Sequence, residues 1–247
     1  MPSAYVPIRT PRISEEIGAR IRQQIASGEL KPNDRLPTER ELSEMFAVSR
    51  MAVREGMRNL EVAGLITLKK GRSGGAFVAD GGAKLVTQSF RDMIDLGRAS
   101  VDMLLEARLH VMDTVVRLAC RRARAAHLAA LEKNLTEATA LTEQGRFEER
   151  TYKAIEFNRL LAEATGNVIL TAMVEGLSDV LRHFVALAGP RVHDPVLTTR
   201  RTLLDQIRAR DEEAAARTME TYLRGLQAHL EKARRPAERQ SVEARAR

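Results

Sequence analysis

The sequence predicts a mostly α protein, with an N-terminal winged helix-turn-helix followed by an all-α helical bundle. Three observations support this. Two short amphipathic segments with good cap residues flank a two-residue break at 47–48, and two short strand patterns follow them. Beyond residue 84 the apolar residues recur at helical spacing only. Aromatic residues are 4% of the 247 residues, so the cores must be built from aliphatic side chains, which favours helices.

The chain opens with a proline-containing arm over 1–12, which we expect to be irregular. Ser14 is well placed to cap a first helix. Its isoleucines at 17, 21 and 25 repeat at helical spacing and form one apolar stripe, and the helix should end near Gly28.

The second predicted helix begins after Thr38. Thr38 and Glu41 have the spacing of a capping box, in which each side chain satisfies a backbone N–H of the first turn. Leu42, Met45 and Phe46 are then expected to form a buried stripe. The two residues at 47–48 leave room only for a tight turn.

The third predicted helix starts after Ser49, a favourable N-cap residue. Apolar residues at 53, 57 and 60 share one face, whereas arginines at 50, 54 and 58 share another. Two short helices joined by a brief turn, the second with a row of arginines near its start, are typical of a helix-turn-helix that enters the major groove.

A basic, glycine-rich hairpin is predicted next. The strand patterns cover 65–68 and 76–78, and the intervening residues 69–75 include Lys70, Gly71 and Arg72. Small residues let a backbone approach phosphates closely while the charges neutralise them. The hairpin is therefore predicted to be the wing.

The remainder is predicted to be a bundle of helices. Their expected spans are 86–96, 101–123, 126–143, 148–164, 168–187, 196–209 and 212–233. The expected organisation is a DNA-binding domain at 1–80, a linker at 81–84, a helical domain at 85–233 and a basic disordered tail at 234–247.

Charge and cysteine content narrow the function. Residues 1–80 hold 13 Lys/Arg against 10 Asp/Glu, and residues 232–247 hold 6 against 2, whereas the middle holds 21 of each. The excess positive charge thus lies at the DNA-reading end and in the tail. One cysteine and no membrane-length apolar run predict a cytoplasmic location and no membrane partner.

The first domain resembles the DNA-binding domain of the GntR family of bacterial transcription regulators. The segment GELKPNDRLPTERELSEMFAVSRMAVREGMRNLEVAGLI, ending at Ile66, carries the resemblance. It implies base-edge contacts by three residues: Arg40, Arg50 and Arg54. It implies contacts to phosphates or the minor groove by four others: Ser49, Lys70, Gly71 and Arg72. Met51 and Ala52 depart from the family, which often has hydroxyl residues there.

The bundle resembles the effector domain of the FadR-like branch of that family. The matching segments are LLEARLHVMDTVVRLAC, FNRLLAEATGN and LLDQIRARDEEAAARTM. Many members of this branch bind a metal with one Asp and three His. Those positions fall here on Ala154, Asn158, Arg200 and Tyr222, none of which is a good metal ligand. We therefore expect no metal and no other cofactor.

The same positions suggest an acidic effector. The resemblance implies that Asn158, Arg200 and Tyr222 converge on one cavity with Arg108. A guanidinium can hold a carboxylate bidentately where a metal could otherwise do so. The hypothesis assigns the carboxylate to Arg108 and Arg200, and hydrogen bonds to Asn158 and Tyr222. His183 lies on an apolar helix, where a histidine is more often a satisfied core residue. It is therefore kept only as a weaker candidate for the cavity.

Two alternatives stay open for this cavity. Arg200 could instead pair with a core carboxylate such as Glu106 or Glu156. The effector could also be an acyl-CoA thioester rather than an organic acid, since metal-free members of the branch include acyl-CoA sensors.

The functional prediction is a DNA-binding regulator and not an enzyme. No Ser/His/Asp order, paired carboxylates or metal cluster suggests catalysis. We expect a homodimer that binds a short palindromic operator in double-stranded DNA as a repressor and leaves it when the effector binds. The alternative is an architectural DNA-binding protein whose bundle only dimerises, recognised by sequence-blind, salt-driven affinity.

Overall fold

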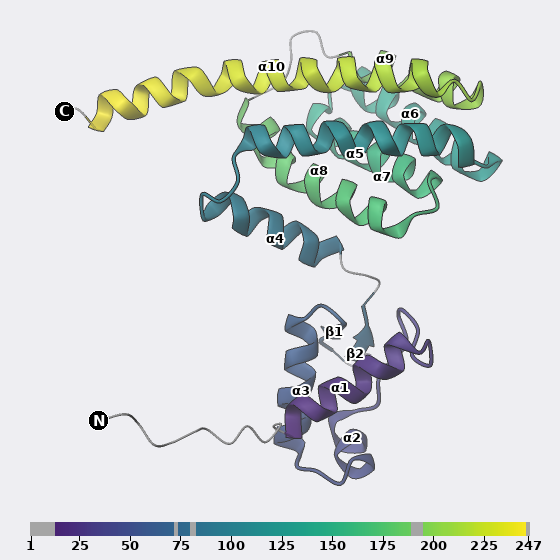
Figure 1. Cartoon of the computed structure of the whole chain (residues 1–247), viewed down its shortest axis with the longest axis vertical. Coiled ribbons are helices and arrows are strands. Elements are labelled where there is room, and N and C mark those ends of the chain that lie inside the picture. The colour runs from purple at the N-terminus through teal and green to yellow at the C-terminus, as the bar shows by residue number, and fades with distance from the viewer. Residues whose placement is uncertain (1–12, 72–73, 80–82, 189–194, 246–247) are drawn as a thin grey trace, which may run out of the picture. The chain divides into compact units, whose positions relative to one another are not determined.

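The chain divides into two compact units, Met1–Leu85 and Val86–Arg247 (Figure 1). The computed structural model describes residues 13–71, 74–79, 83–188 and 195–245, and describes side chains at all of these except 83–84 and 234–245. Among the helices in these ranges, none has the combination of length and apolar character that crossing a bilayer requires.

The first unit contains three helices and a two-stranded sheet, in the order α1 (Ile13–Ala26), α2 (Glu39–Met45), α3 (Arg50–Val62), β1 (Ile66–Lys69) and β2 (Gly75–Val78). This is the predicted order of a winged helix-turn-helix. The observed limits differ from the predicted ones by only one or two residues, as expected for frayed element ends.

The predicted caps of α2 and α3 are confirmed. The Thr38 backbone N–H donates to Glu41 Oε2 at 2.7 Å, and the Glu41 N–H donates to the Thr38 hydroxyl at 3.3 Å. The Ser49 hydroxyl accepts from the Ala52 N–H at 3.2 Å. Between the two helices Ala47 has a φ of 53°, in the left-handed region, which turns the chain within two residues.

The wing is a regular antiparallel hairpin. Ile66 pairs with Val78 and Lys69 pairs with Gly75. An isolated bridge between Arg35 and Phe77 extends the pairing of β2 to the segment before α2. Hydrogen bonding on both edges anchors β2, so the base of the wing is tied to the helix-turn-helix.

The core of this unit is aliphatic and joins α1, α3 and the sheet. It is formed by residues that are almost wholly buried: Ile17, Ile21, Leu36, Leu42, Val53, Met57, Leu60 and Ile66. Met45, predicted to be buried, is 70% exposed. The seven-residue α2 packs on α3 mainly through the Leu42 side of the helix, so Met45 faces water and the predicted stripe is narrower.

The second unit contains seven helices and no strand in the part of the chain that the structure describes. The helices are α4 (Ala83–Asp95), α5 (Val101–Arg122), α6 (Ala125–Glu143), α7 (Phe147–Ala164), α8 (Val168–Ala188), α9 (Val196–Arg208) and α10 (Glu212–Arg245). Ser100 caps α5 through its hydroxyl. Asn167 and Asp211 likewise accept backbone N–H groups at the starts of α8 and α10.

The end of α10 differs from the prediction. The predicted disordered tail begins at 234, but the helix continues to Arg245. Once a helix has formed, each added residue gains one hydrogen bond without a new nucleation step. Ala, Arg, Glu and Gln in this stretch are strong helix formers and favour propagation, whereas Pro236 has no N–H to donate and opposes it.

α5 is the central helix of the bundle, since it packs against α7, α8, α9 and α10. Its residues Val115, Val116, Ala119 and Cys120 are completely buried. Cys120 acts as a small apolar residue here, because burial raises the pKa of its thiol and keeps it protonated.

The buried residues of the bundle form two separate clusters. One cluster includes Met112 of α5, and the other includes Leu105, about two turns earlier on the same helix. On α10, Tyr222 packs against the first cluster and Leu226 belongs to the second. Val111 of α5 packs against both clusters, so they adjoin along this helix.

Candidate functional site

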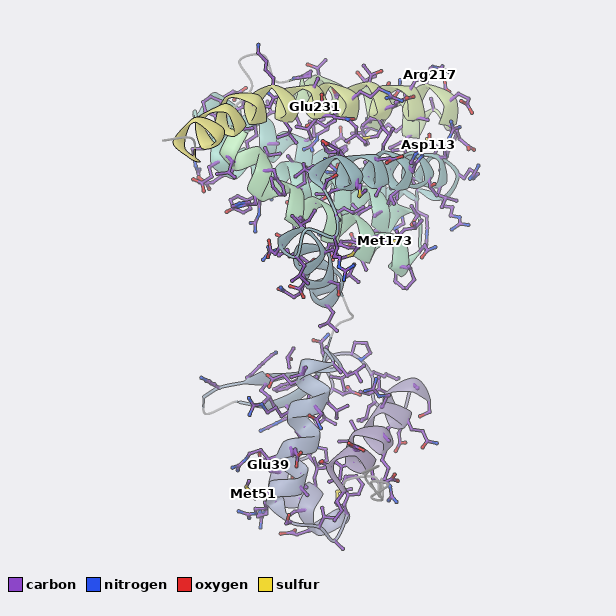
Figure 2. The ribbon with its side chains drawn as sticks, turned by 60° about the vertical axis from the view of Figure 1, so that its left-hand side comes forward. Glu39, Met51, Asp113, Met173, Arg217 and Glu231 are labelled. Atoms are coloured by element: carbon purple, nitrogen blue, oxygen red, sulfur yellow. The ribbon has the colours of Figure 1, made fainter. Side chains whose placement is uncertain are left out.

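The predicted DNA-reading arginines all lie on the accessible surface of the first unit. Arg50 is the first residue of α3, Arg54 lies one turn later, and Arg40 is on α2. All three side chains are exposed, as is the neighbouring Met51 at 71%. Figure 2 shows Met51 and Glu39 on the same flank of this unit. This geometry leaves the face open for a nucleic acid.

Arg54 is held by a carboxylate. Its Nε donates to Glu39 Oε1 at 3.0 Å and its Nη2 donates to Glu39 Oε2 at 2.7 Å. The guanidinium and the carboxylate therefore form a bidentate fork of two parallel hydrogen bonds. Hydrogen bonds from Arg54 hold the pKa of Glu39 below its ordinary value. Arg40, by contrast, makes a single looser contact with Glu44 at 3.8 Å.

The wing offers part of the predicted phosphate-binding set. Lys70 and Gly71 are exposed, and Gly71 has a φ of 107° that a side chain would strain. Arg72 lies outside the described residues. Ser49 is exposed, and its hydroxyl accepts the Ala52 N–H as the cap of α3.

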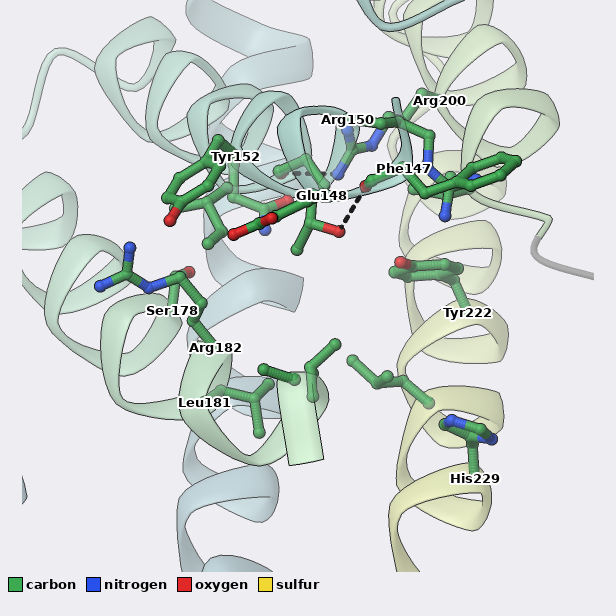
Figure 3. Close-up of a pocket in the computed structure, with 18 of the residues that line it drawn as sticks. Phe147, Glu148, Arg150, Tyr152, Ser178, Leu181, Arg182, Arg200, Tyr222 and His229 are labelled. Carbon is green, nitrogen blue, oxygen red and sulfur yellow. Dashed lines mark hydrogen bonds between the residues drawn. The ribbon is translucent and has the colours of Figure 1, made fainter. Parts of the chain in front are cut away.

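A cavity of about 430 Å³ lies in the second unit, between α5, α7, α8, α9 and α10 (Figure 3). In Figure 3, Tyr222 and His229 project from α10, and Ser178, Leu181 and Arg182 project from α8. The walls are largely aliphatic and aromatic. Polar and charged residues also line the cavity, and they include the four bundle residues predicted to converge: Arg108, Asn158, Arg200 and Tyr222.

Arg108 is the most unusual polar group of the cavity. It is 6% exposed, and its Nε and Nη1 find no hydrogen-bond partner in the described protein. Desolvation lowers the pKa of its guanidinium, and the nearby Tyr222 partly offsets this effect. The Ser178 hydroxyl, which also lines the cavity, is likewise buried without a partner. Unsatisfied buried donors of this kind are costly, and an anionic group supplies the acceptors that such donors need.

Arg200 is oriented by the backbone of α7. Its Nη2 donates to the Ala154 carbonyl at 2.6 Å, and its guanidinium lies 4.7 Å from the centre of the Phe157 ring. Glu156, one of the carboxylates considered as its partner, accepts instead from Lys153 and Asn134. These contacts hold the Arg200 side chain in the wall of the cavity, against α7.

His183 is not brought to this site. It is exposed on α8, outside the cavity lining, and its ring meets the edge of Phe184. Its apolar neighbours Val180, Leu181 and Phe184 pack in the second apolar cluster, to which His183 does not belong. The structure therefore does not place His183 among the residues that line the cavity.

The residues at the four metal positions of the family do come together, since Ala154 lines the cavity with Asn158, Arg200 and Tyr222. A methyl group, an amide, a guanidinium and a phenol do not make a metal site. The described residues contain no cluster of three or more His, Cys, Asp or Glu suited to a metal. The donor set thus fits an anion better than a cation.

One carboxylate links the cavity to α4. Asp179 accepts from Arg182, a cavity residue, at 2.8 Å and also pairs with Arg91 of α4. On the adjacent turn Gly176 lies close to Phe90, since a Cβ there would come within 3.1 Å of its ring. The wall of the cavity is therefore also the docking surface of the helix that follows the first unit in sequence.

Sequence reasoning missed several lining residues, notably Ser178, Tyr152 and Arg182. Arg182 stacks over the Tyr152 ring at 5.4 Å. No local pattern marks these residues, because serine or arginine on an amphipathic helix ordinarily faces solvent. Ser178 is recognisable only after its burial without a partner is known.

Comparison with known proteins gives a consistent result for both units. Residues 13–78 match the family described as "Bacterial regulatory proteins, gntR family", and residues 103–225 match the FCD domain family. Together the two matches span the helix-turn-helix with its wing and most of the bundle.

Individual relatives agree with these matches. The chain is 31% identical over 157 residues to the HTH-type transcriptional regulator LutR of Bacillus subtilis, covering 64% of this chain and 70% of LutR. It is 28% identical over 234 residues to the transcriptional repressor NanR of Salmonella schwarzengrund, covering 90% and 86%. The solved structure of a Streptococcus agalactiae GntR protein matches the fold with a TM-score of 0.68, at 21% identity over 87% of this chain and 99% of that one.

Proposed function

The chain belongs to the GntR family of bacterial regulatory proteins and carries an FCD domain, and we propose that it is a repressor released from a palindromic operator by a small organic acid. Like its relatives, it is a DNA-binding transcription regulator and not an enzyme. The proposal covers its role as a repressor, the acid as its effector and its cytoplasmic location. The relative NanR is named a transcriptional repressor, which supports the repressor role.

The observation that carries the effector proposal is the buried guanidinium of Arg108. Arg108 lines the cavity together with Ser178, Asn158 and Tyr222, and its Nε and Nη1 are buried without a hydrogen-bond partner in the described protein. A carboxylate is the small-molecule group that best satisfies such donors, because it supplies charge and two acceptor oxygens. A volume of about 430 Å³ lies at the small end of ligand pockets and favours a compact acid over a bulky acyl-CoA thioester.

The DNA-binding proposal rests on the exposed arginine face and the wing of the first unit. Two copies related by a two-fold axis would place two α3 helices in successive major grooves of a short palindrome. The rival is an architectural protein whose affinity is sequence-blind. The fixed orientation of Arg54 supports base reading, since a purely electrostatic contact needs no defined side-chain geometry.

Release of DNA requires that the effector bind one arrangement of the protein more tightly than another. The contacts of α8 support a route for this coupling. The helix lines the cavity through Ser178 and Arg182 and holds α4 through Asp179 and Gly176. An acid that draws Arg182 toward the cavity would weaken its pairing with Asp179 and so alter the seating of α4.

A thermal-shift screen of the chelator-treated protein tests the effector class. We expect a carboxylic acid to raise the unfolding midpoint, because a ligand that binds only the folded state stabilises it by mass action. The acid identified should also lower the affinity for the operator, measured by fluorescence anisotropy. An unfolding midpoint raised only by Zn²⁺ or Ni²⁺ would contradict the anion site. A midpoint raised only by acyl-CoA thioesters would identify a thioester, and not a small acid, as the effector.

A competition measurement separates the regulator from the architectural protein. The wild-type protein bound to a selected operator duplex should survive a large excess of unrelated DNA, because base contacts add to the phosphate contacts that any duplex offers. An architectural protein would be displaced in proportion to the competitor. If unrelated DNA displaced the protein at a concentration equal to that of the operator, the proposed sequence-specific function would be excluded.

A further inference from the structure

The ion pair between Glu39 and Arg54 joins the first residue of α2 to the middle of α3, across the turn of the helix-turn-helix. Besides the two contacts of the fork, Arg54 Nε lies 3.2 Å from Glu39 Oε2. The pair stays accessible, with 62% of the arginine side chain and 40% of the glutamate side chain exposed. A surface pair of this kind contributes little to stability, so its geometry is the more informative feature.

The fork uses a particular edge of the guanidinium. A guanidinium offers five N–H donors, and the carboxylate occupies the Nε and Nη2 side. The terminal edge, formed by Nη1 and the second hydrogen of Nη2, remains available for a ligand. Guanine presents two acceptors, O6 and N7, in the major groove, and arginine binds them bidentately. An arginine already held along its side can bind them only end-on.

The other two arginines of the reading face are less constrained. Arg40 has one contact of 3.8 Å with Glu44, four residues along the same helix. The Arg50 side chain makes no hydrogen bond or ion pair within the described residues and acts on Glu39 only through its charge. Of the three, Arg54 is therefore the one whose direction is set before DNA arrives, and preorganised contacts discriminate best because less side-chain freedom is lost on binding.

We propose that Glu39 is a positioning residue that aims Arg54 end-on at a guanine, and so sets the base preference at one position of each operator half-site. This inference rests on the proposed function, in which the first unit reads an operator. Glu39 itself carries a negative charge toward the phosphates. It therefore opposes binding to DNA in general while it sharpens the choice among sequences.

These two effects give Glu39→Gln an unusual signature. The amide is nearly the same size, but it is neutral and offers only one acceptor oxygen to the guanidinium fork. The preference for guanine at one symmetric position should fall on the order of tenfold, which is within the range that one bidentate contact provides. Affinity for unrelated DNA should stay the same or rise. A residue with a merely structural role would lower both affinities together.

The experiment begins with selection of binding sites by the full-length wild-type protein from a randomised duplex library. Dissociation constants are then measured for the selected duplex, for its single-base variants and for unrelated DNA, using the wild type, Glu39→Gln and Glu44→Gln. Glu44→Gln is the matched control, because it removes the same charge from the same helix but frees only the loosely held Arg40. It should leave every base preference unchanged.

A double substitution identifies the arginine concerned. Arg54→Ala should abolish the guanine preference at the same position, and adding Glu39→Gln to it should change that preference no further. Equal unfolding midpoints of Glu39→Gln and the wild type would establish that the helix-turn-helix is intact.

The results that would overturn the inference are distinct from failure of the proposed function. If the wild type selects a site and Glu39→Gln preserves the guanine preference, the positioning role is wrong and sequence-specific binding stands. The positioning role is also wrong if Glu39→Gln weakens binding to all duplexes equally. If the wild type enriches no site from the library, the proposed sequence-specific function itself is refuted.

Discussion

Replacing Arg108 with methionine is expected to abolish the response to the effector and to stabilise the effector-free protein. The Arg108 side chain is 6% exposed, and two of its nitrogens have no partner in the described protein. An aliphatic side chain of similar length removes this desolvated charge. Substitution of buried charged groups by apolar ones can add about 1–4 kcal/mol, which corresponds to several degrees in the unfolding midpoint.

Loss of the same charge removes the main contact proposed for the carboxylate. A bidentate charged hydrogen bond contributes about 3 kcal/mol, so affinity for the acid should fall by roughly a hundredfold or more. Calorimetric titration and thermal unfolding measure the two effects on one preparation. Opposite signs, greater stability with less binding, are typical of a functional residue that is retained at a cost in stability.

Arg208→Met is the matched control for this substitution. Arg208 lies on α9 but outside the cavity, and it pairs on the surface with Glu132. Its replacement should alter neither the acid affinity nor the midpoint by much, since exposed ion pairs contribute little. Acid binding by Arg108→Met with unchanged affinity would refute the effector site, and a lowered midpoint would indicate that Arg108 has a structural partner.

Gly56→Val is expected to unfold the DNA-reading unit. Gly56 lies on α3 where α1 crosses it, and even a single Cβ would come within 2.8 Å of the Ser14 carbonyl oxygen and 3.2 Å of Ile17. The carbonyl belongs to the backbone of α1 and cannot rotate away. Overpacking of this kind costs about 1–3 kcal/mol or more, a large part of the stability of a small unit.

The expected result is loss of operator binding with retention of acid binding, because the effector cavity lies wholly in the second unit. Circular dichroism and anisotropy measure the two outcomes. Gly18→Ala is the control on the facing helix, where a new Cβ would meet only atoms 4.0 Å away. It should be neutral or stabilising by about 0.5–1 kcal/mol through helix propensity. Operator binding by Gly56→Val at wild-type affinity would refute the close packing.

The local features of the first unit could be predicted from neighbouring residues. Thr38 with Glu41, and Ser49, satisfy backbone groups within one turn, so their caps follow from spacing alone. Met45 and His183 show the limit of periodicity. A helical pattern indicates which residues share a face, but only the packing partner determines how wide the buried face is and which polar residue falls outside it.

The cavity illustrates a different limit. Arg108, Asn158, Arg200 and Tyr222 are grouped only by resemblance to a family, since no spacing rule connects residues on four separate helices. Ser178 is absent from that grouping. Its significance depends on a hydroxyl that is buried with no partner, which is a property of the assembled bundle and not of α8 alone.

By itself, the sequence determined the class of the protein, the order of its elements and the face of α3 that carries arginines, because caps, turns and helical periodicity act over a few residues. Only the tertiary structure decided which charges meet. Glu39 reaches Arg54 across a turn, and two nitrogens of Arg108 are buried without a hydrogen-bond partner in the described protein. Both depend on how helices pack against one another, and packing is set by contacts between residues far apart in the chain.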